Sequence, residues 1–308
     1  MKLVVTLGGN ALLRRGDAMT EANQRAQVQV AAKALATVAK KHELILSHGN
    51  GPQVGLIALQ NDAFNHKVPA YPLDNLGAQS QAMIGYLFAQ AMKAELPEKT
   101  VISVLTQTEV NPADPAFSNP TKFIGPVYSE AEANALKESK GWVVKPDGKY
   151  WRRVVPSPKP QHIVEMPAIE ALVNAGMLVI AAGGGGVPVI QTPQGPQGLE
   201  AVIDKDYAGA LMATELKADK LIIATDVDGV YVSWGTPEQK RIARANPQAL
   251  LAMGFAAGSM GPKIEAAANF ATAGLGDAVI GALENITDMV ENQAGTVVSA
   301  SVEGIEFA

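Results

Sequence analysis

Short apolar runs alternate with longer amphipathic segments along most of the chain. The apolar runs predict buried strands at Leu3–Leu7, Glu43–Ser47, Val101–Leu105, Leu178–Ala182, Leu221–Ala224 and Ala278–Gly281. Residues 21–41 instead follow the period of a helix, with apolar residues at positions 28, 31, 32, 35 and 38, and Thr20 can cap its start. Strands that alternate with helices predict a mainly parallel sheet with helices on both faces.

Residues 112–160 interrupt this rhythm. They contain eight of the 19 prolines together with Trp142 and Trp151, and their net charge is +3 in a chain whose total is −5. A proline-stiffened segment of this length inside an α/β domain predicts a protruding subdomain. Its positive charge favours an anionic ligand, although a solvated loop explains the same composition.

Composition excludes several classes of protein. The net charge of −5 argues against binding driven by nucleic-acid phosphates, and the lack of cysteine excludes disulfides, thiolate nucleophiles and iron–sulfur clusters. Only four histidines are present, which disfavours a multi-histidine metal site. The apolar stretch Met177–Ile190 is too short and too rich in glycine to span a bilayer, and the first residues lack the pattern of a signal peptide. We therefore expect a cytoplasmic protein.

Three glycine clusters directly follow predicted strands: Gly8–Asn10, Gly49–Gly51 and Gly183–Gly186. In an open parallel sheet such loops share the edge formed by the carboxyl ends of the strands, where ligands bind. Glycine leaves backbone N–H groups accessible, so the clusters favour a phosphate or other anion, with ordinary tight turns as the alternative for each one. The chain has no P-loop motif, no dinucleotide fingerprint, no protein-kinase motif set and no hydrolase elbow.

Two lysines lie at predicted helix starts. Lys205 precedes a helix expected over Tyr207–Leu216, and Lys263 follows Pro262. A cation there opposes the helix dipole, so an anion between the two lysines would compensate, although each one alone fits a surface lysine. Asp204 and Asp206 flank Lys205 and could orient it, cap the helix or bind a metal. From spacing alone, residues 225–231 fit a turn and His48 fits a structural histidine.

These segments, taken in order, resemble the carbamate kinases of the amino-acid kinase family. The resemblance rests on residues 6–11 (TLGGNA), 48–55 (HGNGPQVG), 122–126 (KFIGP), 151–158 (WRRVVPSP), 183–189 (GGGGVPV), 201–206 (AVIDKD) and 258–263 (GSMGPK). It implies a three-layer α/β/α sandwich formed by one domain, residues 1–308. An N-terminal half, about 1–175, would hold carbamate and include the subdomain, and a C-terminal half, about 176–308, would hold the nucleotide. A homodimer is also implied.

The same resemblance implies reversible transfer of a phosphoryl group between ATP and carbamate, with Mg²⁺ accompanying the nucleotide and no metal held by the protein alone. It assigns catalysis to Lys122, Lys205, Lys263 and Asp206. It assigns the acceptor substrate to the backbone of Gly8, Gly9, Asn10, Gly49, Asn50 and Gly51. It assigns the nucleotide, besides Lys205 and Lys263, to Gly184, Gly185, Thr225, Asp226, Tyr231 and Met260.

One feature distinguishes this sequence from other members of that family. Relatives that act on other acceptors carry a lysine before the first glycine pair, whereas this chain reads Val5-Thr6-Leu7-Gly8-Gly9, and the matching charge would come from Lys122. Another small-molecule kinase of the family and a non-catalytic nucleotide sensor on the same fold remain alternatives. A dehydrogenase is a more distant one.

Overall fold

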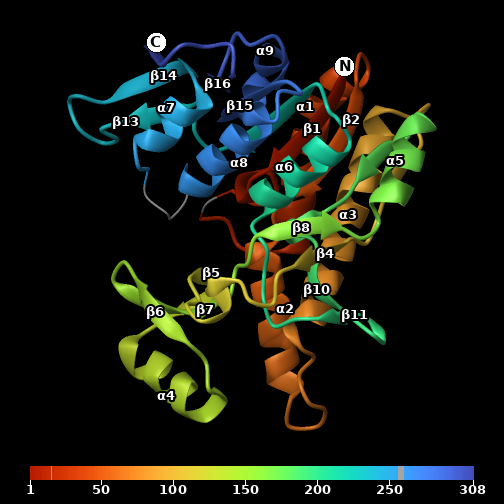
Figure 1. The fold of residues 1–308 in the computed structure, drawn as a ribbon. Helices are drawn as coiled ribbons and strands as arrows, with labels where there is room; N and C mark the ends of the chain where they lie inside the picture. Colours follow the sequence, from red (N-terminus) through yellow and green to blue (C-terminus); the bar gives the residue numbers. More distant parts are fainter. Residues whose placement is uncertain (15, 256–259) are drawn as a thin grey trace.

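The computed structural model describes residues 1–14, 16–255 and 260–308. Within them, one mainly parallel sheet of ten strands forms the centre of the molecule (Figure 1). Its strands follow the order β13 (Val230–Val232), β14 (Lys240–Ala245), β16 (Thr296–Val298), β15 (Asp277–Ala282), β12 (Lys220–Thr225), β1 (Lys2–Leu7), β2 (Glu43–His48), β9 (Leu178–Ile180) and β3 (Val101–Ser103), with β17 (Ile305–Phe307) paired to β14.

Alternating side chains of the central strands build two separate apolar layers. In β1, Leu3, Val5 and Leu7 are buried on one face of the sheet, and Val4 is buried on the other. The first face is covered by α1 (Glu21–Ala39), α3 (Leu73–Glu95) and α9 (Ile286–Val290). The second is covered by α5 (Met166–Asn174), α6 (Lys205–Glu215) and α8 (Met260–Thr272). The predicted α/β/α sandwich is therefore confirmed.

The proline-rich segment forms a small unit that stands off the main sheet (Figure 1). It contains β5 (Lys122–Tyr128), α4 (Glu130–Lys140), β6 (Val144–Asp147) and β7 (Tyr150–Val155), and its strands form a separate sheet in the order β5-β7-β6. Ser129 and Glu132 form a capping box at the start of α4. The guanidinium of Arg153 lies 4.5 Å from the ring centre of Trp142, which ties β7 to the end of α4.

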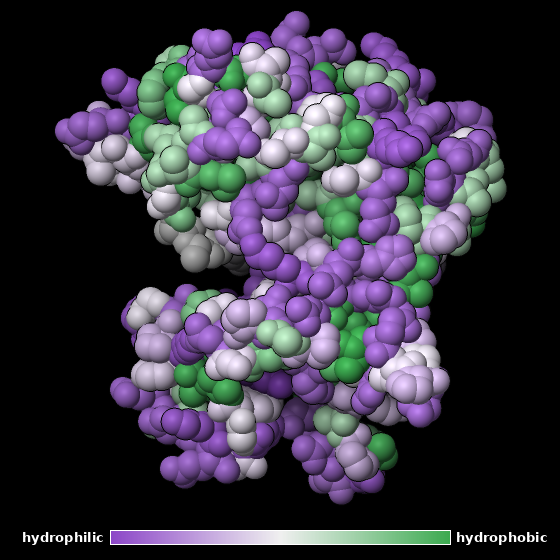
Figure 2. Space-filling view, viewed as in Figure 1, coloured by the Kyte–Doolittle hydropathy of each residue, from purple (hydrophilic) through white to green (hydrophobic). Residues whose placement is uncertain are grey.

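A second sheet joins this subdomain to the main body. It has the order β11 (Gly195–Gly198), β10 (Val187–Thr192), β4 (Gln107–Val110) and β8 (Pro160–Ile163). Helix α2 (Gly51–Phe64) runs beside the subdomain, and a Cβ built on Gly55 of α2 would lie 2.6 Å from the Cα of Gly125 in β5. Figure 2 shows the surface hollowed between the main body and the part that contains the subdomain.

The predicted strands all form, with ends that differ by one or two residues. The helix predicted over Tyr207–Leu216 begins two residues earlier, at Lys205. The side chain of Asp204 accepts a hydrogen bond from the N–H of Asp206 and so caps the helix at that point. Strand β9, which the expected boundary near residue 176 assigns to the C-terminal half, lies between β2 and β3 of the N-terminal half. In the part of the chain that the structure describes, no helix combines the length and the apolar character needed to cross a membrane.

Candidate active site

The three glycine clusters lie at one edge of the main sheet, as the strand order predicts. The N–H of Gly8 donates to the carbonyl of Ala224 at 3.0 Å, and the N–H of Gly49 donates to the carbonyl of Leu7 at 3.0 Å. These bonds align the carboxyl ends of β12, β1 and β2. Beyond them the chain continues as the short helices η1 (Gly9–Ala11) and η3 (Gly183–Gly185) and as the start of α2. This edge therefore presents several backbone N–H groups, an arrangement suited to an anion.

The carboxylate of Asp206 joins the two lysines that the sequence singled out. Its Oδ1 lies 2.9 Å from Nζ of Lys205, and its Oδ2 lies 2.9 Å from Nζ of Lys263. The hydroxyl of Thr6, on the neighbouring strand β1, donates to Oδ1 at 2.9 Å. Asp206 is 1% exposed. The two ammonium groups are thus held side by side by one buried carboxylate.

Charge pairing in this cluster is stronger than the cost of burial. Burial by itself would raise the pKa of Asp206, but Lys205 and Lys263 hold that pKa well below its usual range. Burial likewise acts to lower the pKa of Lys205, yet Asp206 and Asp204 raise it above the usual value. Lys205 is therefore bound as an ammonium ion whose counter-charge is the buried carboxylate of Asp206.

The subdomain contributes a third lysine. Nζ of Lys122, on β5, donates to Oδ2 of Asp204 at 2.5 Å. Burial acts to raise the pKa of Asp204, but Lys122 and Lys205 bring it below its usual value. Lys122 thus meets the residue that precedes Lys205.

Some of the remaining predicted residues lie beside the lysines or the glycine loops, and others form no hydrogen bond with the lysines. A Cβ built on Gly49 would lie 3.4 Å from Cδ of Lys205, so the second glycine loop packs along that lysine. Thr225 ends β12 beside Gly8, whereas Tyr231 lies on β13 and donates its hydroxyl to Asp228 at 2.7 Å. Among the described residues, neither Tyr231 nor Met260, the first residue of α8, forms a hydrogen bond with the lysine cluster. Gly258 and Ser259 of the motif that contains Lys263 lie outside the described residues.

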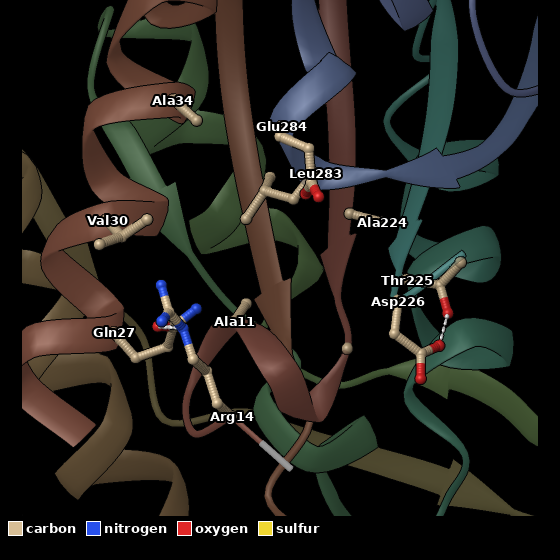
Figure 3. A pocket seen from close by; sticks show the side chains of 11 residues that line it. Ala11, Arg14, Gln27, Val30, Ala34, Ala224, Thr225, Asp226, Leu283 and Glu284 are labelled. Atoms are coloured by element: carbon tan, nitrogen blue, oxygen red, sulfur yellow. Dashed lines mark hydrogen bonds between the residues drawn. The ribbon is translucent and has the colours of Figure 1, made fainter. Parts of the chain in front are cut away.

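A cavity of about 640 Å³ adjoins the first glycine loop on the α1 side of the sheet (Figure 3). Arg14 and Gln27 lie on one side of it and Thr225 and Asp226 on the other, as Figure 3 shows. The full lining consists of Gly8, Ala11, Arg14, Gln27, Val30, Ala34, Ala224, Thr225, Asp226, Leu283 and Glu284. Two residues expected at the nucleotide therefore face open space next to Gly8.

Comparison with known proteins shows the family of this chain. A family model described as the amino acid kinase family matches residues 1–281. The chain belongs to the amino acid kinase family. Two curated relatives are named carbamate kinase: the protein of Haemophilus influenzae is 50% identical over 100% of this chain and 99% of its own length, and that of Pyrococcus horikoshii is 46% identical over 97% and 99%.

A solved structure extends this likeness to the fold. The structure titled carbamate kinase from Giardia lamblia bound to AMP-PNP superposes with a TM-score of 0.90 at 38% identity, and the match covers 97% of this chain and 98% of the other. Within the amino acid kinase family, this chain therefore belongs with the carbamate kinases.

Gly184 is required for the packing of the second glycine loop of this kinase. Its φ is +64°, and an added Cβ would lie 2.2 Å from Nδ2 of Asn50. Asn50 in turn donates to the hydroxyl of Ser80, a fully buried residue of α3, at 2.8 Å. Gly185 packs similarly, since its Cβ would lie 2.5 Å from the carbonyl oxygen of Ile203. Both glycines, which the resemblance assigned to the nucleotide, thus lie against residues 50 and 203.

We expect Gly184→Ala to lower kinase turnover by roughly tenfold or more, because the new methyl group displaces Asn50 from Ser80. The matched control is Gly148→Ala, since Gly148 has nearly the same φ, +63°, and open space around it. The control should lose only about 1–2 kcal/mol of stability from the left-handed backbone and keep its turnover. Urea unfolding and steady-state kinetics on both variants measure the two effects, and equal turnover in them would contradict this role of the contact.

His48 is buried between the glycine loops. It is 1% exposed, its ring stacks on Phe88 with centroids 6.1 Å apart, and a Cβ on Gly183 would lie 2.5 Å from its Nε2. Its Nδ1 lies 3.0 Å from the carbonyl of Gly49. Burial lowers the pKa of His48 to about 4, so the ring is neutral at neutral pH. The structure therefore agrees with a structural role, not with that of a general base.

This burial predicts a pH dependence of stability. Between pH 6.5 and about 4 the unfolded chain binds a proton at His48 and the folded chain does not, so the free energy of unfolding should decrease as pH falls through that range. The contribution of His48 reaches at most about 1.4 kcal/mol per pH unit and is complete above pH 6.5. Urea unfolding at pH 7, 6 and 5 gives the slope of the free energy of unfolding against pH. This slope should be smaller for His48→Gln than for the wild type. The control is His66→Gln, a change at an exposed histidine, which should keep the slope of the wild type. Equal slopes in all three proteins would contradict the neutral buried ring.

Sequence reasoning missed two residues of the site, Thr6 and Ser80, and it named Asp204 without its role as the partner of Lys122. Thr6 and Ser80 are buried and donate or accept hydrogen bonds inside it, and Asp204 binds Lys122. Asp204 had a signal, since an aspartate directly before a helix is typical of a cap. Thr6 and Ser80 had none, because their partners lie 200 and 30 residues away in sequence.

Proposed function

We propose that the chain catalyses reversible phosphoryl transfer between ATP and carbamate, which gives ADP and carbamoyl phosphate. The observation that carries this proposal is the pair formed by Lys205 and Lys263 on the buried carboxylate of Asp206, at the edge where the glycine loops meet. It is supported by the two relatives of 50% and 46% identity that are named carbamate kinase.

The charges of the cluster suit a migrating phosphoryl group. Three ammonium groups and two carboxylates, Lys122, Lys205, Lys263, Asp204 and Asp206, leave one net positive charge. During transfer the negative charge spreads over the equatorial oxygens of the phosphoryl group, and fixed positive charge with aligned N–H groups stabilises that state more than water does. The lysines would therefore bind the phosphates, and Asp206 would orient two of them.

The acceptor needs no proton removed. Carbamate is already an anion whose oxygen can attack the γ-phosphorus, so a site without a titrating base is sufficient, in keeping with the neutral, buried His48. Backbone N–H groups of the first two glycine loops would hold the carbamate. The nucleotide would be held by Thr225, Asp226, Tyr231 and Met260. In support, the solved carbamate kinase of Giardia lamblia is described as bound to AMP-PNP.

The nucleotide would bring Mg²⁺ with it. Both candidate carboxylates, Asp204 and Asp206, are engaged by lysines, and no group of three metal-ligating side chains occurs among the described residues. The phosphates and water would therefore supply the ligands of Mg²⁺. We further infer that the reaction runs toward ATP synthesis in the breakdown of arginine or a related compound, because carbamoyl phosphate is an energy-rich mixed anhydride. We also infer a cytoplasmic location and, from the family resemblance, a homodimer.

The decisive experiment is the ATP-forming assay. Purified protein with MgADP and carbamoyl phosphate should form ATP, detected by luciferase, and should form little with acetyl phosphate in its place. ATP from acetyl phosphate alone would favour a kinase for another acceptor. Binding of ADP without turnover would favour a nucleotide sensor, and either result would overturn the proposal.

A further inference from the structure

Asp204 uses its two carboxylate oxygens for different parts of the molecule. Oδ1 accepts the N–H of Asp206 at 3.0 Å and so caps α6. Oδ2 accepts Nζ of Lys122 at 2.5 Å, from a strand of the subdomain. The residue is 8% exposed, so its carboxylate is largely shielded from solvent.

We propose that Asp204 is a positioning residue that fixes the ammonium of Lys122 over the phosphoryl-transfer edge. This inference rests on the proposed function, since it concerns where one of its lysines is held. The adjoining residues Lys205 and Asp206 begin the helix that Asp204 caps. One tripeptide, residues 204–206, therefore sets the position of lysines from both the subdomain and the main body.

Lys122 needs such a partner because its side chain is only partly buried. Its side chain is 38% exposed, and a lysine stem has several freely rotating bonds whose ordering costs about 2 kcal/mol of entropy. An ammonium group has three donors. Asp204 takes one of them, and two are left to bind the oxygens of an anionic substrate while the ion pair stays intact.

The variant that tests this role is Asp204→Asn. Asparagine caps helices as well as aspartate does, but it carries no charge to hold Lys122. We expect kcat for ATP formation to fall by roughly tenfold or more. The affinity for ADP should stay within about twofold, because the main-body lysines keep their partner Asp206. A loss of ADP affinity equal to the loss of kcat would show that Asp204 acts through α6 instead, and would overturn the proposal.

A double-mutant cycle with Lys122→Met tests whether Asp204 affects kcat through Lys122. If Asp204 acts through Lys122, adding Asp204→Asn to Lys122→Met should lower kcat by less than about twofold further. Fully additive losses would contradict the proposal. Should Asp204→Asn fail to fold, Asp204→Ser offers another uncharged cap for the same cycle.

The subdomain supplies a matched control. Lys140 of α4 forms an ion pair with Asp62 of α2, so Asp62→Asn also removes an ion pair between the subdomain and its neighbour. Its kcat should remain near that of the wild type. Equal losses of kcat in Asp62→Asn and Asp204→Asn would mean that kcat depends on the docking of the subdomain as a whole and not on the placement of Lys122. An inactive wild type would instead overturn the proposed function, so the two failures are distinguishable.

Discussion

Lys205→Ala is expected to lower the turnover of ATP formation by about a hundredfold or more, with the fold intact. The ammonium of Lys205 is held 2.9 Å from Asp206 and its stem packs along Gly49, so it is fixed before substrate binds. A fixed cation at the migrating phosphoryl group stabilises the transition state without reorganisation, and its loss costs several kcal/mol of barrier. Lys263→Ala should show a loss of similar size, because Lys263 shares the same carboxylate.

Lys220→Met provides the control for removal of a buried lysine. Lys220 is 6% exposed and donates to the carbonyl of Val290 and to Asn292, but it begins β12 and so lies at the opposite edge of the sheet. Its replacement should alter stability and leave turnover unchanged. Steady-state kinetics together with thermal unfolding of the three variants separate these effects. Near-normal turnover in Lys205→Ala would remove that lysine from the mechanism.

Asp206→Asn is expected to lose more stability than any other variant described above. Its turnover should also fall by at least about a hundredfold. Without the carboxylate, two ammonium groups remain buried side by side with no shared counter-charge, which costs about 3 kcal/mol or more. The hydroxyl of Thr6 also loses a charged acceptor. Urea unfolding and ATP formation, measured in parallel, test both parts.

The pH dependence of this stability difference has a definite sign. The pKa of Asp206 is lower in the folded chain than its unfolded value of 3.8, so the carboxylate stabilises the fold fully above that value and loses this contribution as pH falls below it. The difference between the wild type and Asp206→Asn should therefore stay constant from pH 8 to 5 and shrink only below about pH 4. A difference that changes between pH 8 and 6 would contradict the ion-paired state.

Much of the fold was predictable from local patterns. The runs at Leu3–Leu7 and Glu43–Ser47 predicted buried strands, and the glycine clusters after them predicted a ligand edge, because a parallel sheet brings its carboxyl ends together. Proline content alone indicated the extra unit within residues 112–160. The start of α6 was missed by two residues because the cap at Asp204 outweighed the apolar pattern that begins at Tyr207.

The site was less predictable than the fold. The sequence indicated Lys205 and Lys263 through their positions at helix starts. That one carboxylate, Asp206, orients both lysines followed only from the family resemblance and from no local pattern. The placement of Gly184 against Asn50 and the depth of His48 depend on how loops 134 residues apart pack together, which no local pattern encodes.

The sequence by itself determined the alternation of strands and helices, the glycine loops at one edge and the identity of the charged residues. Only the tertiary structure decided that Lys122 meets Asp204, that Lys205 and Lys263 meet on Asp206, and that Thr6 completes the cluster. The physical reason is that propensity and periodicity act over a few residues, whereas ion pairs between distant segments form only when close packing of the whole chain sets their distances and excludes water.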